Sequence, residues 1–461
     1  MARLLVLILI LGVWLELTLR TVSVAHASGN AVARFGGEHG TVNDTNPTAL
    51  YYNPGAIGFS KGLQLFLDGQ LAVRSLTWSH TPGQGDVDPP QAYRGANYGR
   101  ASATNLFGGP MLGATLQLSN FVLGAAAYAP FGGNVSFDEN AHYLSREYPG
   151  ARDGVARWHG IDGATMSIYT TLGVAYRLGC LSFGVTGNLI LTSLHLTRAQ
   201  TLDGTNDLKQ EGRSQIDVSG VHGSFGLGVM LEVLPERLYL SASYQAQPGL
   251  GVQKLDGALR VDSTVHDGAD SFTRDVTFHQ ALPDIWRLGA RFKPTPSVEL
   301  RLAADLTRWS VLQTQCVSLR NAACVVTPDG DGLPDGGVVQ NIRRYWRDTV
   351  GVRVGASMWV TPALELFAGL GYEMGASPDR TLEPVLADGD NMAVALGGRI
   401  QVAHSWFLAA GYTHLQFLPR DNTGKSQLAD PFTAALTRRP DAGGQYEQWV
   451  AIVNMNVTKT F

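Results

Sequence analysis

Charged residues and cysteines are both scarce in this chain of 461 residues. Asp, Glu, Lys and Arg make up 16% of it, against roughly 25% in typical soluble domains. The 35 basic residues do not outnumber the 39 acidic ones. Without a basic excess the chain is no polybasic nucleic-acid binder, so we expect no nucleic-acid partner. Three cysteines are too few for a disulfide-stapled mini-scaffold.

Long apolar runs are also missing, except for one near the start at residues 4–15. As a helix this run is too short to span the hydrocarbon core, which is about 30 Å thick. Ala25-His26-Ala27 places small residues at the positions that signal peptidase requires. We therefore interpret residues 1–27 as a secretion signal. The alternative is a short membrane anchor.

The chain does contain a repeated alternation of apolar and polar residues. From Thr349 to Met358, valine, alanine and methionine occupy one face, while glycine, arginine and serine fall on the other. Successive side chains of a strand point to opposite faces, so this pattern predicts strands with one apolar face. We expect about 14 such strands, at residues 62–74, 110–119, 121–130, 166–178, 181–196, 214–233, 237–262, 272–293, 298–311, 343–360, 363–374, 392–402, 405–418 and 446–461.

A soluble β-sandwich shows the same alternation, but three features favour a membrane barrel. Most segments are longer than ordinary strands and match a tilted membrane strand. Aromatic residues such as Trp359, Tyr372 and Trp406 cap the apolar faces. Tight connections alternate with long polar ones, as periplasmic turns alternate with external loops. The predicted fold is an all-β, transmembrane antiparallel β-barrel over residues 62–461, in the outer membrane. Pro248 and Pro283 are expected to break two of its strands.

Residues 28–61 lack the alternation and are rich in Gly, Asn and Ala. Short apolar patches separated by turns are typical of a compact plug, so we interpret this segment as an N-terminal hatch inside the lumen. The alternative is a disordered periplasmic leader.

Several motifs, spread in order along the chain, resemble the OmpP1/FadL/TodX family of outer-membrane transporters. The hatch motif Asn53-Pro54 resembles the family's Asn-Pro-Ala-Gly signature, although Gly55-Ala56 stands where Ala-Gly is usual. The further motifs are Ala129-Pro130-Phe131-Gly132, Leu282-Pro283-Asp284, Trp309-Ser310 and Trp346-Arg347-Asp348-Thr349, followed by Arg353-Val354-Gly355. The resemblance covers essentially the whole mature chain.

This resemblance implies a monomeric barrel of about 14 strands that takes up long-chain fatty acids or aromatic hydrocarbons through outer-membrane lipid. It implies no cofactor. Asn53, Pro54 and Gly55 would belong to the moving hatch. A kinked strand at Pro130, Phe131, Gly132 and Gly133 would open the wall sideways, because proline lacks an N–H and glycine permits unusual backbone angles. The alternative for this second group is an ordinary strand end.

Inward-facing arginines are the candidate partners of a ligand carboxylate: Arg287, Arg291, Arg353 and Arg399. The alternative is that they form lumenal ion pairs.

Cys316 and Cys324 share one external loop and are expected to form a disulfide in an oxidising compartment. Residues 329–335 resemble part of a calcium loop, but Gln340 stands where the bidentate Glu belongs, so we interpret them as a solvated turn and expect no metal site.

Three functions compete at this point. The leading hypothesis is a gated transporter for hydrophobic ligands. The second is a general porin with an open aqueous channel. The third is a barrel enzyme, which is disfavoured because the sequence has no Gly-x-Ser-x-Gly elbow and no paired-histidine metal motif.

Overall fold

The computed structural model describes residues 34–140, 142–143, 147–262, 271–325, 337–430 and 438–461. Its strands form one antiparallel sheet that closes on itself, because β1 pairs with both β2 and β19. The strands are β1 (Leu63–His80), β2 (Gly99–Leu118), β3 (Phe121–Ser136), β4 (Asp162–Leu178), β5 (Leu181–Gln200), β6 (Gly212–Leu234), β7 (Leu238–Gln245), β8 (Val252–Asp262), β9 (Ser271–Ala281), β10 (Ile285–Thr295), β11 (Val298–Thr307), β12 (Thr314–Leu319), β13 (Val338–Arg343), β14 (Thr349–Thr361), β15 (Leu364–Glu373), β16 (Asn391–Ala403), β17 (Trp406–Phe417), β18 (Arg420–Asp421) and β19 (Gly444–Thr460).

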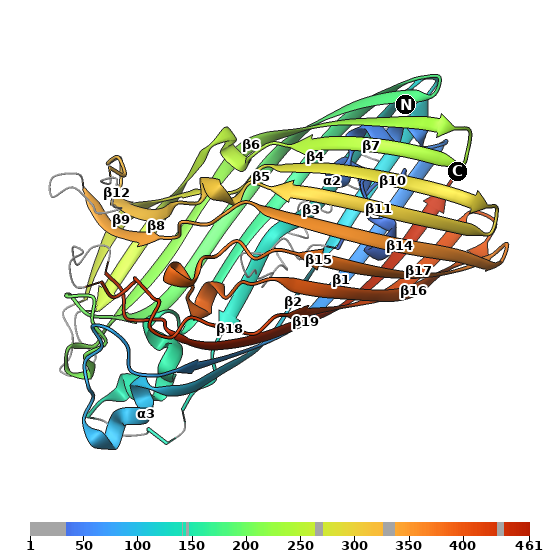
Figure 1. Ribbon diagram of the computed structural model, residues 1–461. Coiled ribbons are helices and arrows are strands. Elements are labelled where there is room, and N and C mark those ends of the chain that lie inside the picture. Colours follow the sequence, from blue (N-terminus) through green and yellow to red (C-terminus); the bar gives the residue numbers. More distant parts are fainter. Residues whose placement is uncertain (1–33, 141, 144–146, 263–270, 326–336, 431–437) are drawn as a thin grey trace.

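The closed ring has 14 strand positions, which confirms the predicted fold class. Around the ring, β1 to β7 are followed by β10, β11, β14 to β17 and β19. The remaining strands lengthen the wall at one end, where β8 pairs with β6 and β9, and β12 pairs with β9 and β13. Figure 1 shows this extension at the end opposite the C-terminus.

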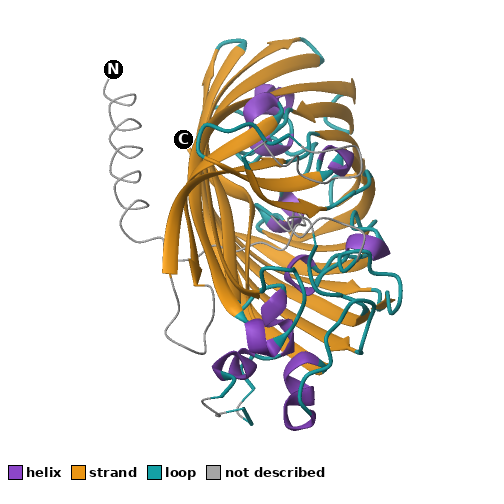
Figure 2. Cartoon of the chain, turned by 90° about the vertical axis from the view of Figure 1, so that its left-hand side faces the viewer, coloured by secondary structure: helices purple, strands orange, loops and turns teal. Residues whose placement is uncertain are grey.

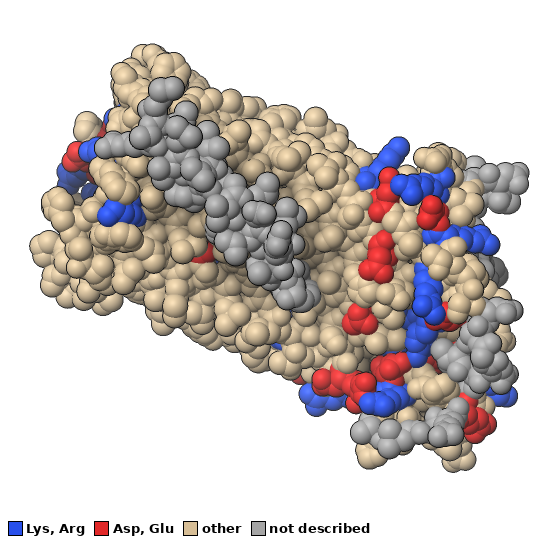
Figure 3. Space-filling model, turned by 180° about the vertical axis from the view of Figure 1, so that it is seen from behind, with Lys and Arg blue, Asp and Glu red and all other residues tan. Residues whose placement is uncertain are grey.

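The outer face of the wall is apolar, as the alternation predicts. Leucines that point outward, such as Leu172 and Leu189, keep 64% and 61% of their surface exposed. The next residues along each strand, Thr171 and Ile190, are fully buried inside. Charged side chains gather towards the two ends of the molecule, while the middle of the face shown in Figure 3 is almost free of them. Such a belt fits the hydrocarbon core of a membrane.

Short helices lie inside the ring and among the long loops (Figure 2). They are η1 (Gly37–His39), α2 (Ala49–Tyr52), η2 (Pro54–Phe59), η3 (Gln91–Tyr93), α3 (Arg94–Asn97), η4 (Pro149–Asp153), η5 (Val155–Trp158), η6 (Leu208–Gln210), η7 (Pro248–Leu250), η8 (Trp309–Val311), η9 (Asp379–Thr381) and η10 (Pro384–Leu386). Within the described residues, none of the helices has the length and hydropathy needed to cross a membrane. The predicted signal at 1–27 lies outside these residues.

Both prolines expected to break strands do so. Pro248 opens η7 between β7 and β8, and Pro283 lies between β9 and β10. Two further breaks, at η8 and before β14, were not predicted. They carry no proline and are fixed instead by buried Trp309 and Trp346, whose rings pack edge to face at 4.8 Å. The sequence interpretation consequently missed the outer hairpin β12–β13.

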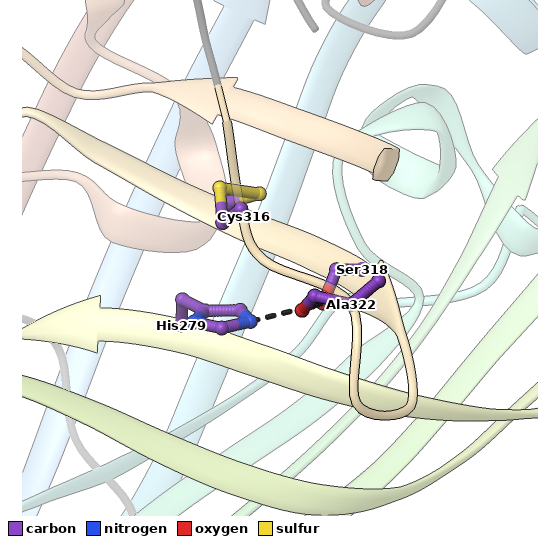
Figure 4. The surroundings of a disulfide bond; sticks show 5 residues. His279, Cys316, Ser318 and Ala322 are labelled. Atoms are coloured by element: carbon purple, nitrogen blue, oxygen red, sulfur yellow. Dashed lines mark hydrogen bonds between the residues drawn. A yellow bond between two sulfur atoms is a disulfide. The ribbon is translucent and has the colours of Figure 1, made fainter. Parts of the chain in front are cut away.

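A disulfide joins Cys316 of β12 to Cys324, with their Cα atoms 6.3 Å apart. Beside it, the Ser318 hydroxyl donates to the carbonyl of Ala322 at 2.9 Å and lies 3.0 Å from Nε2 of His279 on β9 (Figure 4). These contacts hold the outer hairpin against the wall. The calcium-like segment 329–335 lies outside the described residues.

Candidate functional site

The segment before β1 folds as a hatch that is packed inside the barrel. Asn53, which is fully buried, ties it together. Its side-chain oxygen accepts from the N–H of Gly55 at 3.0 Å and so caps η2. Its Nδ2 donates to the carbonyl of Val42 at 2.9 Å and to that of Val229 on β6 at 3.1 Å. One side chain therefore joins two hatch segments and the wall.

Glycines on the wall let the hatch approach more closely than any side chain would allow. A Cβ on Gly55 would lie 2.7 Å from the backbone of Gly228 on β6. A Cβ on Gly184 of β5 would collide with the backbone of Pro54. Leu50 fills the space beside Gly124 and Gly173 in the same way. Backbone packs directly on backbone here, which explains part of the chain's high glycine content.

Gly184→Ala should loosen the hatch. The added methyl group has no room, so the Pro54–Gly55 segment must move away from β5. We expect unstable baseline currents with frequent openings in planar-bilayer recordings, where the unaltered protein stays closed. Gly187→Ala on the same strand is the matched control, because nothing lies within 4 Å of its Cβ position. Equal noise in both variants would contradict this role of Gly184.

Side chains from the neighbouring strands β7 and β10 hold the hatch by hydrogen bonds. On β7, the Ser241 hydroxyl donates to the carbonyl of Val42 at 2.9 Å, and the Ser243 hydroxyl donates to that of Tyr52 at 2.6 Å. Arg287 of β10 donates to the carbonyl of Tyr51 at 3.3 Å and stacks over its ring at 4.6 Å. The hatch is thus held against four consecutive strands of the ring, by close contact with β5 and β6 and by polar contacts with β7 and β10.

The four inward arginines proposed as ligand partners have other neighbours in this closed state. Arg287 holds Tyr51, and Arg291 stacks over Tyr239 at 4.4 Å. Arg399 forms an ion pair with Glu365 at 3.0 Å. Arg353 lines a small polar cavity between hatch and wall, together with Arg34, Tyr51, Tyr52, Arg287, Asp305 and Glu373. The alternative expectation, that these arginines form lumenal ion pairs, describes Arg399. It does not describe Arg287 and Arg291, which contact aromatic rings rather than carboxylates.

Glu365 on β15 is the centre of the ion-pair network beneath η1. Besides Arg399, it contacts Nε2 of His39 at 2.9 Å and Arg301 at 3.6 Å. Arg301 also donates to the carbonyl of Glu38 at 2.7 Å. His39 and Glu38 belong to the hatch, so this network anchors η1 to the wall through hydrogen bonds to the charged side chains of Glu365 and Arg301.

The motif at Pro130 lies within a strand and not at its end. β3 continues to Ser136, so the alternative of an ordinary strand end is wrong. Its register with β4 shifts between Tyr128 and Phe131, which places a bulge at Ala129 and Pro130. A bulge bends the strand that carries it, and Pro130 has no N–H with which to restore the ladder.

Beyond this bulge β3 separates from β2. Their pairing stops at Leu112 and Ala127. Farther along, two hydrogen bonds connect this part of the chain to β2 again. The Asp138 N–H, just after β3, donates to the carbonyl of Ser102 at 2.8 Å, and Asn105 Nδ2 donates to that of Ser136 at 3.2 Å. We call the stretch between, residues 106–111 of β2 and 128–135 of β3, the β2–β3 seam. Within the described part of the chain, no ladder pair crosses it.

A chain of aromatic rings leads from the hatch to the β2–β3 seam. Phe35 contacts Tyr128 with ring centroids 5.4 Å apart, and Tyr128 stacks on Tyr169 of β4 at 5.5 Å. Phe131, next to the bulge, lies 6.4 Å from Tyr169 and 6.5 Å from Trp309. All of these rings are buried in one apolar cluster. The interior between hatch and seam is therefore apolar, although the surrounding lumen is polar.

The comparisons with known proteins agree with this architecture. Residues 19–461 match the family described as outer membrane protein transport protein (OMPP1/FadL/TodX). The chain belongs to the FadL/TodX family. It is therefore an outer-membrane transport protein, and its family is one of transporters and channels. A comparison with curated protein sequences finds no match.

Solved structures of this family show the same fold at low sequence identity. A FadL homologue of Pseudomonas aeruginosa superposes with a TM-score of 0.73 at 17% identity, covering 95% of this chain and 99% of that one. The toluene transporter TbuX of Ralstonia pickettii gives 0.60 at 15% identity, covering 90% and 94%. The toluene transporter TodX of Pseudomonas putida gives 0.60 at 16% identity, covering 90% and 93%. The FadL/TodX fold of this chain is thereby established.

Proposed function

We propose that this FadL/TodX-family protein takes up hydrophobic small molecules, such as long-chain fatty acids or related apolar ligands, by passive diffusion. The ligand enters from the external loops and rests against the aromatic chain above the hatch. It leaves sideways into the membrane through the β2–β3 seam. The observation that carries the proposal is the unpaired β2–β3 seam in the wall, directly beside buried Phe131.

The energetics support this route. Each buried CH₂ group of a ligand gains about 0.8 kcal/mol on leaving water, so an apolar interior concentrates such molecules. The seam adjoins the apolar outer surface, where Leu106 of β2 is 57% exposed. A ligand crossing there passes from one apolar environment to another and never re-enters water. Family members described as toluene transporters act on molecules of this class.

The close packing of the hatch weighs against the general porin. A porin requires a hydrated passage along the barrel axis. Here the hatch backbone touches Gly184 and Gly228 and is hydrogen-bonded to Ser241 and Ser243 on the neighbouring strand, while His39 contacts Glu365 of β15 farther round the ring. An axial passage for water-soluble molecules would require all of these contacts to be released.

Deleting Pro130 tests the seam. Between Tyr128 and Phe131, two residues of β3 stand opposite the single residue Ile168 of β4, so the bulge contains one extra residue. Without this extra residue β3 can run straight and pair with β2, so we expect uptake of a fluorescent hydrophobic probe to fall to the level of cells that lack the protein. Deleting Pro89 from a long external loop is the control, and should leave uptake intact. The folded barrel of each variant is checked by its heat-dependent migration in gels. Normal uptake by a folded Pro130 deletion would overturn the lateral route.

A further inference from the structure

Two buried polar groups beside the aromatic chain have no hydrogen-bond partner in the described part of the molecule. One is the hydroxyl of Tyr169 on β4, which is fully buried. The other is Nδ2 of Asn188 on β5, a residue that keeps only 6% of its surface exposed. A buried donor without an acceptor costs free energy. These two groups therefore mark a place where an oxygen atom would be stabilised.

A directional chain of hydrogen bonds fixes the orientation of the Asn188 amide. The Thr171 hydroxyl donates to Oδ1 of Asn188 at 2.7 Å. Thr171 has a single hydrogen to donate, so the Tyr128 hydroxyl, 2.9 Å away, is the donor in the contact between those two groups. The chain runs from Tyr128 through Thr171 to Asn188, and it ends with an NH₂ group that meets no acceptor among the described residues.

The register of the wall brings the two unpartnered groups towards each other. Tyr128 and Tyr169 are direct partners on β3 and β4, and their rings stack 5.5 Å apart with 20° between the planes. The Tyr128 hydroxyl reaches Thr171, its diagonal neighbour on the next strand. Asn188 holds the same diagonal position relative to Tyr169, one strand farther on. Because the two rings are nearly parallel, the Tyr169 hydroxyl is directed towards Asn188.

Rings of the hatch cover this place in the closed state. Phe35 and Tyr51 contact the Tyr128 ring with centroids 5.4 Å and 5.3 Å apart. All three rings belong with Tyr169 to one buried apolar cluster. Such surroundings suit an aromatic or aliphatic body and make an ionised group costly. The group that fits the two donors is therefore a neutral oxygen on an otherwise apolar molecule.

We propose that Tyr169 and Asn188 bind the oxygen of a neutral oxygenated ligand, such as a phenol, an alcohol or a ketone, once the hatch rings have moved aside. The inference rests on the proposed uptake function and selects among its substrates by the oxygen they carry. The closed state leaves both donors unpaired. A ligand oxygen removes this penalty, whereas a pure hydrocarbon leaves it in place.

Binding of p-cresol and p-xylene tests this assignment, because the two differ only by a hydroxyl against a methyl group of similar size. Both are titrated by calorimetry into the detergent-solubilised full-length protein, with empty micelles as the blank. Water holds the hydroxyl of p-cresol, so an apolar site without donors would favour p-xylene. We expect the unaltered protein to bind p-cresol at least as tightly as p-xylene. In Tyr169→Phe the ratio of the two dissociation constants should shift about tenfold towards p-xylene, with p-xylene binding unchanged.

The melting temperature separates recognition from folding. Tyr169→Phe removes an unpaired hydroxyl, so its melting temperature should not fall. Tyr446→Phe on β19 is the matched control. The Tyr446 hydroxyl donates to the carbonyl of Ala442 at 2.6 Å, so that variant should melt earlier and keep the preference for p-cresol.

Four outcomes would overturn the inference. They are an unchanged ratio in Tyr169→Phe, a preference of the unaltered protein for p-xylene, binding of neither probe, and tighter binding of the anion p-toluate than of p-cresol. The last would show that the site takes a charged oxygen. None of them decides the proposed uptake, which the Pro130 deletion tests separately.

Discussion

A barrel that lacks residues 34–60 should conduct ions steadily, with a conductance of the order of an open porin. A ring of 14 strands is wide enough to leave an aqueous lumen once nothing fills it. The deletion removes η1, α2 and η2, together with every contact described above from the hatch to β5, β6, β7 and β10. Planar-bilayer recording at fixed voltage measures the change directly, and we expect the intact protein to show no steady current.

The deleted barrel must also be shown to fold, because the hatch contributes Leu50, Tyr51 and Ile57 to the main apolar cluster. Heat-dependent migration in gels and the strand content by circular dichroism provide that check. Gly187→Ala serves as the control that should remain non-conducting, because nothing lies within 4 Å of the added Cβ. A folded barrel that stays non-conducting without residues 34–60 would show that other segments close the lumen, and would disprove the role given to the hatch.

Glu383→Gln should destabilise the external loops by about 3–5 kcal/mol, the usual consequence of breaking a buried ion pair on one side. The substitution removes the carboxylate that Arg344 and Arg439 share. We expect much faster cleavage of the loops by protease and a lower melting temperature. Glu139→Gln removes an exposed partner of Arg152 and should cost no more than about 1 kcal/mol. Equal protease resistance in the two variants would contradict the prediction.

The same carboxylate makes the loops sensitive to acid. Burial alone would raise the pKa of Glu383, but Arg344 and Arg439 hold it well below its ordinary value of 4.5. A depressed carboxyl pKa contributes stability above the unfolded value, and this contribution is lost as pH falls through the folded one. The intact protein should therefore lose loop stability below about pH 4.5. In Glu383→Gln this part of the pH dependence should be absent.

Much of the wall could be predicted from the sequence because a strand in a membrane barrel exposes one face to lipid. Alternation such as that from Thr349 to Met358 reports this directly. The breaks at Pro248 and Pro283 were also predictable, since proline cannot donate to the ladder. The breaks at Trp309 and Trp346 were not predictable, because tryptophan is also common within strands. Here the packing of these rings against other rings ends the strands.

The candidate site was less accessible to sequence reasoning. The bulge at Pro130 could be recognised because proline and glycine leave a local signal. The buried charges of the external loops leave none, since Arg198, Arg344, Glu383 and Arg439 stand far apart in the chain. Likewise, inward arginines can be identified by alternation, but whether Arg287 meets a carboxylate or the ring of Tyr51 depends on where the hatch lies.

The close contact between the hatch and the glycines of the wall restricts which substitutions the protein can accept. Gly184 and Gly228 lie against backbone atoms of Pro54 and Gly55. A methyl group therefore cannot be added to the wall or to the hatch at this contact unless the two move apart. A side chain added at Gly184 or Gly228 therefore requires a compensating change in the hatch segment that faces it. Transplanting this segment into a distant homologue, such as the Pseudomonas aeruginosa protein at 17% identity, should fail unless the facing positions of the recipient are exchanged with it.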